Sequence, residues 1–111
     1  MTARSQLGEF ELIVMLALLR LGDDAYGVPI ARAIEEGTRR EVAIGSVYAA
    51  LERLEQKGLV ASRLGEPTPE RGGRAKRYFR VTGAGLRRVR AAQRALVALW
   101  QGLPQLEGGK A

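Results

Sequence analysis

The stretch that decides the fold is AIGSVYAALERLEQKGLV, residues 43–60. At 100° per residue, Val47, Leu51 and Leu54 form the apolar stripe of a helix, and Gly58 is a suitable helix stop. The opposite face is small at its N-terminal end and polar at its C-terminal end. A recognition helix presents its N-terminal residues to base edges in the major groove, where small side chains let the backbone come close. The stretch therefore predicts a helix that approaches DNA.

The outward face of this helix supplies the first candidates for DNA contact, which are Gly45, Ser46, Tyr48, Ala49 and Arg53. Tyr48 has an alternative role as a boundary aromatic that braces the preceding helix. Arg53 is a better candidate than Glu52, whose charge repels phosphate unless it accepts from a cytosine amino group. Arg39 and Arg40 precede the helix, where they either contact phosphates or are simply solvated.

After Gly58 the pattern becomes strand-like. LVASRL (59–64) and AKRYFRV (75–81) each fit a short strand, with Phe79 and Val81 on one face of the second. The segment between them, GEPTPERGGR, is rich in glycine and proline and too long for a tight turn. The pattern predicts a hairpin whose cations contact DNA phosphates, namely Arg71, Arg74, Lys76 and Arg77.

Two helices are expected before residue 43. The segment 10–22 is apolar at too many positions for a one-sided helix, which predicts that it is buried on most sides. GDD (22–24) then breaks the chain and offers a helix-starting acid, and a shorter helix follows that Gly37 ends. Three helices and a hairpin predict a winged helix-turn-helix domain over residues 1–81.

Thr82 is expected to cap a final helix over residues 82–103. Its apolar residues follow a seam near heptad spacing: Leu86, Val89, Leu96, Trp100 and Leu103. At 1.5 Å per residue this helix extends roughly 30 Å, more than three short helices can cover. We therefore expect a homodimerisation helix, followed by a disordered tail over residues 104–111. The expected fold class is mainly α with a small β-hairpin.

Composition excludes several functions. The 111 residues contain no cysteine and no histidine, so disulfides and the usual zinc ligand sets are absent, and we expect no metal and no cofactor. No phosphate-binding glycine loop or convergent carboxylate pair is present, so no catalytic residue is expected and an enzyme is the least favoured class. The densest apolar run is too short to span a bilayer, which favours a cytoplasmic protein without a membrane partner.

Charge is distributed unevenly along the chain. Residues 1–58 contain seven basic and nine acidic side chains, whereas residues 59–111 contain eleven and three. An excess of this kind indicates a localised basic surface for a polyanion, with an arginine-rich solvated face as the alternative. RNA is the less favoured polyanion, because the few aromatic residues are needed in the core and leave no stacking platform.

These motifs together resemble the PadR family of transcriptional regulators, in its short form with a single C-terminal helix. The resemblance covers about residues 7–103 and rests on Leu16, Leu19, the Tyr26-Gly27 pair, GSVYAALERLEQKGLV and GRAKRYFRVTGAG. It implies a dimeric repressor that binds a partly palindromic double-stranded DNA operator and is released by a small molecule or another signal. Ala43 stands where the family commonly has a hydroxyl cap, which predicts a less well capped helix, and Ala49 where proline is common.

Trp100, the only tryptophan, has two interpretations. It either packs in the dimer seam, as aromatics at helical spacing usually do, or lines a site for a flat aromatic effector. The expected apolar neighbours of such an effector site are Phe10, Met15, Leu96 and Leu99. A winged-helix protein-interaction module without sequence-specific DNA binding is the alternative to a regulator of transcription.

Overall fold

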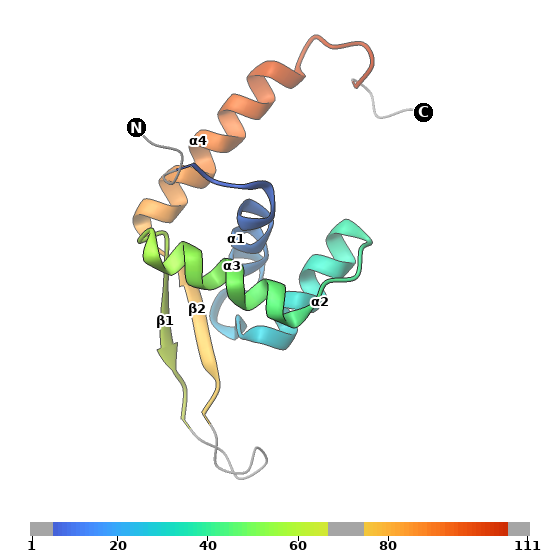
Figure 1. Ribbon diagram of the computed structural model, residues 1–111. Coiled ribbons are helices and arrows are strands. Elements are labelled where there is room, and N and C mark those ends of the chain that lie inside the picture. The colour runs from blue at the N-terminus through green and yellow to red at the C-terminus, as the bar shows by residue number, and fades with distance from the viewer. Residues whose placement is uncertain (1–5, 67–74, 107–111) are drawn as a thin grey trace.

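The computed structural model describes residues 6–66 and 75–106 of the chain. It is mainly helical with one antiparallel hairpin, and is thus the predicted winged helix-turn-helix followed by a long C-terminal helix (Figure 1). The elements are α1 (Glu9–Leu21), the short 3₁₀-helix η2 (Gly22–Asp24), α2 (Gly27–Thr38), α3 (Ile44–Gln56), β1 (Val60–Leu64), β2 (Arg77–Val81) and α4 (Gly83–Trp100).

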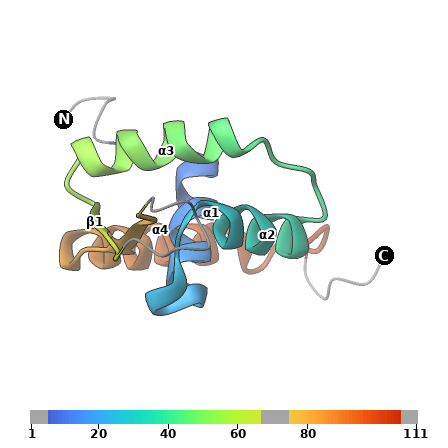
Figure 2. The same ribbon diagram turned by 90° about the horizontal axis from the view of Figure 1, so that it is seen from below.

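The core lies where α1 crosses α2 and α3. Its largest fully buried side chains come from all three helices and from β1: Val14, Met15, Ile30, Val47, Leu51, Leu54 and Val60. Seen from below, α3 and α4 lie on opposite sides of the molecule with α1 between them (Figure 2). The helix expected to meet DNA is therefore separated from the C-terminal helix by the core.

The hairpin stands away from the helical body (Figure 1). Val60 pairs with Val81 and Leu64 with Arg77, and Phe79 is buried while its neighbour Arg80 is exposed, as the predicted alternation requires. The backbone N–H of Phe79 donates to the carbonyl oxygen of Ala25 at 2.9 Å, which ties the base of β2 to the loop before α2.

The expectation that α1 is buried on most sides was wrong for one face. Leu16 and Leu19 are each 45% exposed, although Met15 and Leu18 beside them are buried. The reason is that α2, α3, β2 and α4 contact α1 mainly from other directions and cover this face only in part.

Both ends of α2 differ from the prediction. Gly37 lies inside the helix, which continues to Thr38, and Arg39 adopts the left-handed conformation with φ 63° while its N–H donates to the carbonyl oxygen of Glu35. The hydroxyl of Thr38 donates to the carbonyl oxygen of Ile34, which holds the last turn. At the start, the acids of GDD belong to η2, and Tyr26 is the N-cap, whose side chain does not cap the helix.

The root of α4 is closely packed. Thr82 is the N-cap, as predicted, and its hydroxyl oxygen accepts from the N–H of Gly85 at 3.0 Å. Gly85 is buried so tightly that a Cβ there would overlap the carbonyl oxygen of Leu59. The helix ends at Trp100, three residues before the predicted end, and its far half projects beyond the body (Figure 1).

Candidate nucleic-acid interface

The exposed face of α3 is the one that the sequence predicted. Val47, Leu51 and Leu54 are buried, and Ala50 joins them. This leaves the predicted DNA-contact residues exposed: Gly45, Ser46, Tyr48, Ala49 and Arg53. The first turn of this face therefore carries small side chains, as close approach to a groove requires.

The turn that precedes α3 is fixed by a side chain of α2. The carboxylate of Glu35 accepts from the backbone N–H of Val42 at 2.9 Å. Ala43 is the N-cap of α3 and makes no side-chain cap, so the predicted weak capping is confirmed. Arg39 and Arg40 are exposed in this turn, next to the start of α3.

Tyr48 connects α3 to two other elements. A Cβ at Gly27 would overlap its hydroxyl, so the ring lies directly against the start of α2. Its centroid is 6.3 Å from that of Phe79. This geometry supports the bracing role, and it explains why glycine is needed after Tyr26. Because the ring is still 44% exposed, a contact with DNA stays a prediction beside that role.

A hollow of about 450 Å³ separates α3 from the hairpin. Its lining brings residues of the predicted recognition face together with one predicted wing residue: Gly45, Tyr48, Ala49, Leu51, Glu52, Glu55, Arg77 and Phe79. The Nε of Arg77 donates to the Ser62 hydroxyl oxygen at 3.2 Å, and that hydroxyl donates to the carboxylate of Glu55 at 2.7 Å. The base of the wing is thereby attached to α3.

Two tyrosines and two cations pack on the hairpin. Tyr26 and Tyr78 meet edge to face with centroids 5.4 Å apart. The Nζ of Lys76 lies 4.2 Å from the centroid of Tyr26, and the guanidinium of Arg63 lies 4.6 Å from that of Tyr78. Lys76 is thus held over a ring. The two other predicted wing cations, Arg71 and Arg74, lie outside the described residues.

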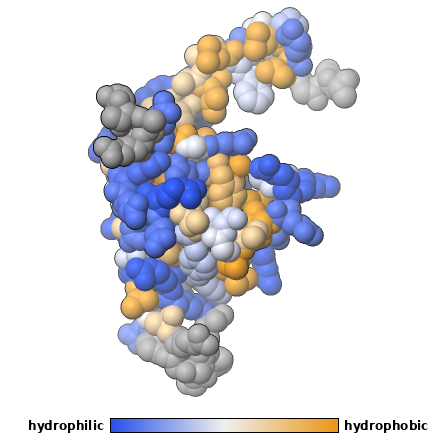
Figure 3. All heavy atoms as spheres, viewed as in Figure 1, coloured by the Kyte–Doolittle hydropathy of each residue, from blue (hydrophilic) through white to orange (hydrophobic). Residues whose placement is uncertain are grey.

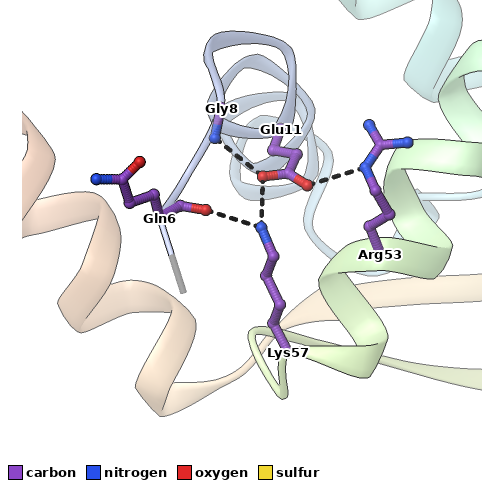
Figure 4. A network of polar contacts seen from close by, with 5 residues as sticks. All are labelled: Gln6, Gly8, Glu11, Arg53 and Lys57. Carbon is purple, nitrogen blue, oxygen red and sulfur yellow. Dashed lines mark hydrogen bonds and ion pairs between the residues drawn. The ribbon is translucent and has the colours of Figure 1, made fainter. Parts of the chain in front are cut away.

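The sequence analysis missed Glu11, a buried acid that joins α1 to the C-terminal end of α3 (Figure 4). Its carboxylate accepts from the Nε of Arg53 at 3.1 Å and from the Nζ of Lys57 at 2.9 Å. It also accepts from the N–H of Gly8 at 2.9 Å, and Lys57 donates further to the carbonyl oxygen of Gln6. A single acid within the apolar run FELIV was the signal that could have found it.

Burial raises the pKa of Glu11, but hydrogen bonds from Lys57 and from the N–H of Gly8 lower it. Arg53 lowers it further, so the pKa lies below the ordinary value of 4.5. The group is therefore a carboxylate at neutral pH. Within the cluster of Glu11, Arg53 and Lys57, one negative and two positive charges leave a net charge of +1.

The residues expected around an effector lie in two separate places. Met15 is fully buried in the core, and Phe10 lines a hollow of about 280 Å³ together with Arg40 and Ser46. Leu96, Leu99 and Trp100 are exposed on the far part of α4, where Figure 3 shows apolar side chains gathered beyond the body. A single chain does not bring these two groups together.

The described residues lack a membrane-spanning helix and a cluster of metal ligands. None of their helices is long and apolar enough to cross a membrane. Within the same residues, no group of three acidic side chains could hold a metal ion.

Comparison with known proteins places this geometry in context. Residues 15–91 match a family described as the transcriptional regulator PadR-like family. A PadR family transcriptional regulator from Eggerthella lenta is 27% identical, with a TM-score of 0.67 over 92% of this chain and 88% of that chain. A PadR-like transcription factor from Bacteroides fragilis is 25% identical, with a TM-score of 0.67 over 81% and 82%.

A PadR family transcription regulator from Clostridium difficile has the same fold at 23% identity, with a TM-score of 0.71 over 91% of this chain and 100% of that chain. None of the curated proteins matches the chain.

Proposed function

The chain belongs to the PadR-like family of transcriptional regulators, and from this premise we propose that it is a sequence-specific DNA-binding repressor that acts as a homodimer. The observation that carries the proposal is the exposed face of α3, whose first two turns present Gly45, Ser46 and Ala49 instead of long charged side chains. Small residues at the start of a recognition helix allow its backbone to reach the base edges. We propose no catalytic activity and no cofactor.

The cations around this face are proposed to position the protein on the DNA backbone. Arg39 and Arg40 lie before α3, Arg53 lies near its end, and Lys76 and Arg77 lie at the base of the wing. Contacts of this kind to phosphates give affinity without sequence preference, whereas the first turn of α3 would give the preference.

The dimer is proposed to form mainly through α4. Its far half exposes Leu96, Leu99 and Trp100, and the uncovered face of α1 exposes Leu16 and Leu19. Exposed apolar side chains gathered on one helix are typical of a protein interface. Two copies would also present two recognition helices to the two halves of a partly palindromic operator.

The test is selection of bound sequences from a random duplex library, followed by affinity measurements over a range of salt concentrations. We expect one enriched, partly palindromic sequence and an affinity that falls steeply with salt. Ala49→Arg should abolish the preference because it blocks close approach. Lys76→Ala with Arg77→Ala should weaken binding to selected and random duplexes equally and reduce the salt slope by about two units.

The outcome against the proposal would be the absence of any enriched sequence together with weak binding that is insensitive to salt. That result would favour a protein-interaction module. A wing variant that changed the selected sequence but kept its affinity would contradict the assignment of reading to α3 and positioning to the wing.

We also propose that a flat aromatic or apolar effector releases the DNA by stacking on Trp100, which is 53% exposed in the single chain. Because Trp100 is the only tryptophan, its fluorescence reports directly on this site. Quenching by phenolic compounds or flat cations should parallel operator release and disappear in a folded, dimeric Trp100→Leu variant. Operator binding that ignores every quenching compound would leave Trp100 as a packing residue.

A further inference from the structure

We propose that Glu11 is a positioning residue for DNA binding, which holds the guanidinium of Arg53 in the orientation in which Arg53 meets the DNA backbone. The inference rests on the proposed function, since it assigns a task to a residue that lies inside the protein. Glu11 itself is 7% exposed at its side chain and cannot reach a ligand.

The two edges of the Arg53 guanidinium have different surroundings. Its Nε donates to the carboxylate of Glu11 at 3.1 Å, and Figure 4 marks this bond and none from either Nη atom to Glu11. The side chain of Arg53 is 52% exposed. The inner edge is therefore occupied, whereas the outer edge carries the paired N–H groups that suit a phosphate.

The carboxylate is itself held rigidly. Lys57 and the N–H of Gly8 both donate to its Oε1, which leaves Oε2 for Arg53. An arginine without such a partner must be ordered when DNA binds, and ordering one long side chain costs affinity. Glu11 orders Arg53 in advance.

A second arginine of the proposed interface is held in the same way. The Nε of Arg77 donates to Ser62, which donates in turn to Glu55. In both cases an acid of the helical body fixes the inner edge of an arginine that lies next to the recognition face.

The inference and simple electrostatics predict opposite changes in DNA affinity for Glu11→Gln. Glu11→Gln removes a negative charge and should strengthen binding to a polyanion if charge alone decides. If Glu11 positions Arg53, the same change should weaken binding roughly three- to tenfold, the cost of ordering one long side chain on binding. Glu9→Gln is the matched control, because Glu9 lies exposed on the same turn of α1 and its replacement changes the charge equally.

The experiment is a double-mutant cycle of Glu11→Gln and Arg53→Ala. Affinity is measured for the selected duplex and for a random duplex of about 30 base pairs, three helical turns. Glu11→Gln should weaken binding in the wild-type background, and its effect should vanish when Arg53 is alanine. Arg53→Ala should reduce the salt slope by about one unit, whereas Glu11→Gln should leave the slope unchanged because the phosphate contact remains.

Thermal unfolding of each variant checks that it is folded at the assay temperature. Arg53→Lys is a second way to remove the bond between residues 11 and 53 while Glu11 stays in place. Lysine keeps the positive charge but has no Nε–H group for Glu11 to accept from. This variant should lose affinity to the same degree as Glu11→Gln.

Two results would overturn the inference. One is an effect of Glu11→Gln that persists undiminished in the Arg53→Ala background, which would show that Glu11 acts through the fold alone. The other is a gain in affinity that matches the Glu9→Gln control. A wild-type chain that binds neither duplex would overturn the proposed function first, so the two failures are distinguishable.

Discussion

At the scale of single residues, the acid Glu11 makes the stability of the protein depend on pH. Its pKa is lowered in the folded chain, so its stabilising effect is complete above the ordinary value of 4.5 and is lost as the pH falls through the folded pKa. The difference in free energy of unfolding between wild type and Glu11→Gln should therefore shrink as the pH is lowered from 7 to 3.

Denaturant unfolding across this pH range measures that difference. Glu9→Gln, which changes an exposed acid of the same helical turn, is the control for the loss of one negative charge. A Glu11→Gln difference that stayed constant from pH 7 to pH 3 would mean that the charge of Glu11 contributes nothing to stability.

Arg39 is held in a conformation that disfavours side chains. Its φ of 63° makes it the one non-glycine residue with positive φ in the described part of the chain, at a cost of about 1 kcal/mol. Arg39→Gly should therefore raise the free energy of unfolding by up to about 1 kcal/mol. If Arg39 also contacts phosphate, the same variant should bind DNA less tightly.

Arg40→Gly is the matched control for Arg39→Gly, because it removes the same charge from a residue whose φ is negative. It should lower stability slightly, since glycine adds freedom to the unfolded chain. Equal changes in stability for the two variants would show that the left-handed conformation of Arg39 carries no cost.

At the scale of elements, the two glycines at the start of α4 have opposite roles. A Cβ at Gly83 would meet only the far end of Arg87, at 3.8 Å, whereas one at Gly85 would overlap the carbonyl oxygen of Leu59. Gly83→Ala should raise stability by about 0.5–1 kcal/mol. Gly85→Ala should lower it by about 1–3 kcal/mol or more, because backbone has to move. Thermal unfolding of the two variants measures both changes in stability. A Gly85→Ala variant that is more stable than wild type would refute the close packing.

The sequence predicted the types and order of the elements because their signals are local. The stripe of Val47, Leu51 and Leu54 and the alternation around Phe79 each follow from neighbours in the chain. The end of α2 was missed because glycine normally marks a helix end, whereas here Arg39 takes the left-handed conformation.

The candidate site was predictable in the same way only in part. The exposed face of α3 could be predicted because its apolar residues recur at the 3.6-residue period of a helix. The partner of Arg53 did not, because Glu11 lies 42 residues away in the sequence, and no local pattern records such a contact. The exposure of Leu16 and Leu19 was not predictable, because an apolar run does not reveal which of its faces is left uncovered.

At the scale of the whole molecule, the chain is extended. Its Cα radius of gyration is 16.0 Å, against about 13 Å for a compact chain of this length. The far half of α4 contributes to this extension and carries exposed apolar residues (Figures 1 and 3). A chain of this shape gains stability when a second copy covers that helix.

Leu96→Glu should therefore dissociate the proposed dimer, because it places a charge in the apolar seam of α4. Ala98→Glu adds the same charge on the opposite side of that helix and should leave the dimer intact. Sedimentation measures the mass, which should fall to the 12.1 kDa of one chain only for Leu96→Glu. A Leu96→Glu variant that sediments like wild type would place the interface elsewhere.

The close packing of Gly85 on Leu59 fixes the angle at which α4 leaves the body. A small change of that angle moves the far end of the helix. At about 1.5 Å per residue, the part of α4 from Gly85 to its end at Trp100 measures about 22 Å, so a tilt of about 10° at Gly85 moves the far end by about 4 Å. In a dimer joined through those ends, the same angle alters the separation of the two recognition helices. Residues at this pivot would thus influence the spacing of operator half-sites in the proposed dimer.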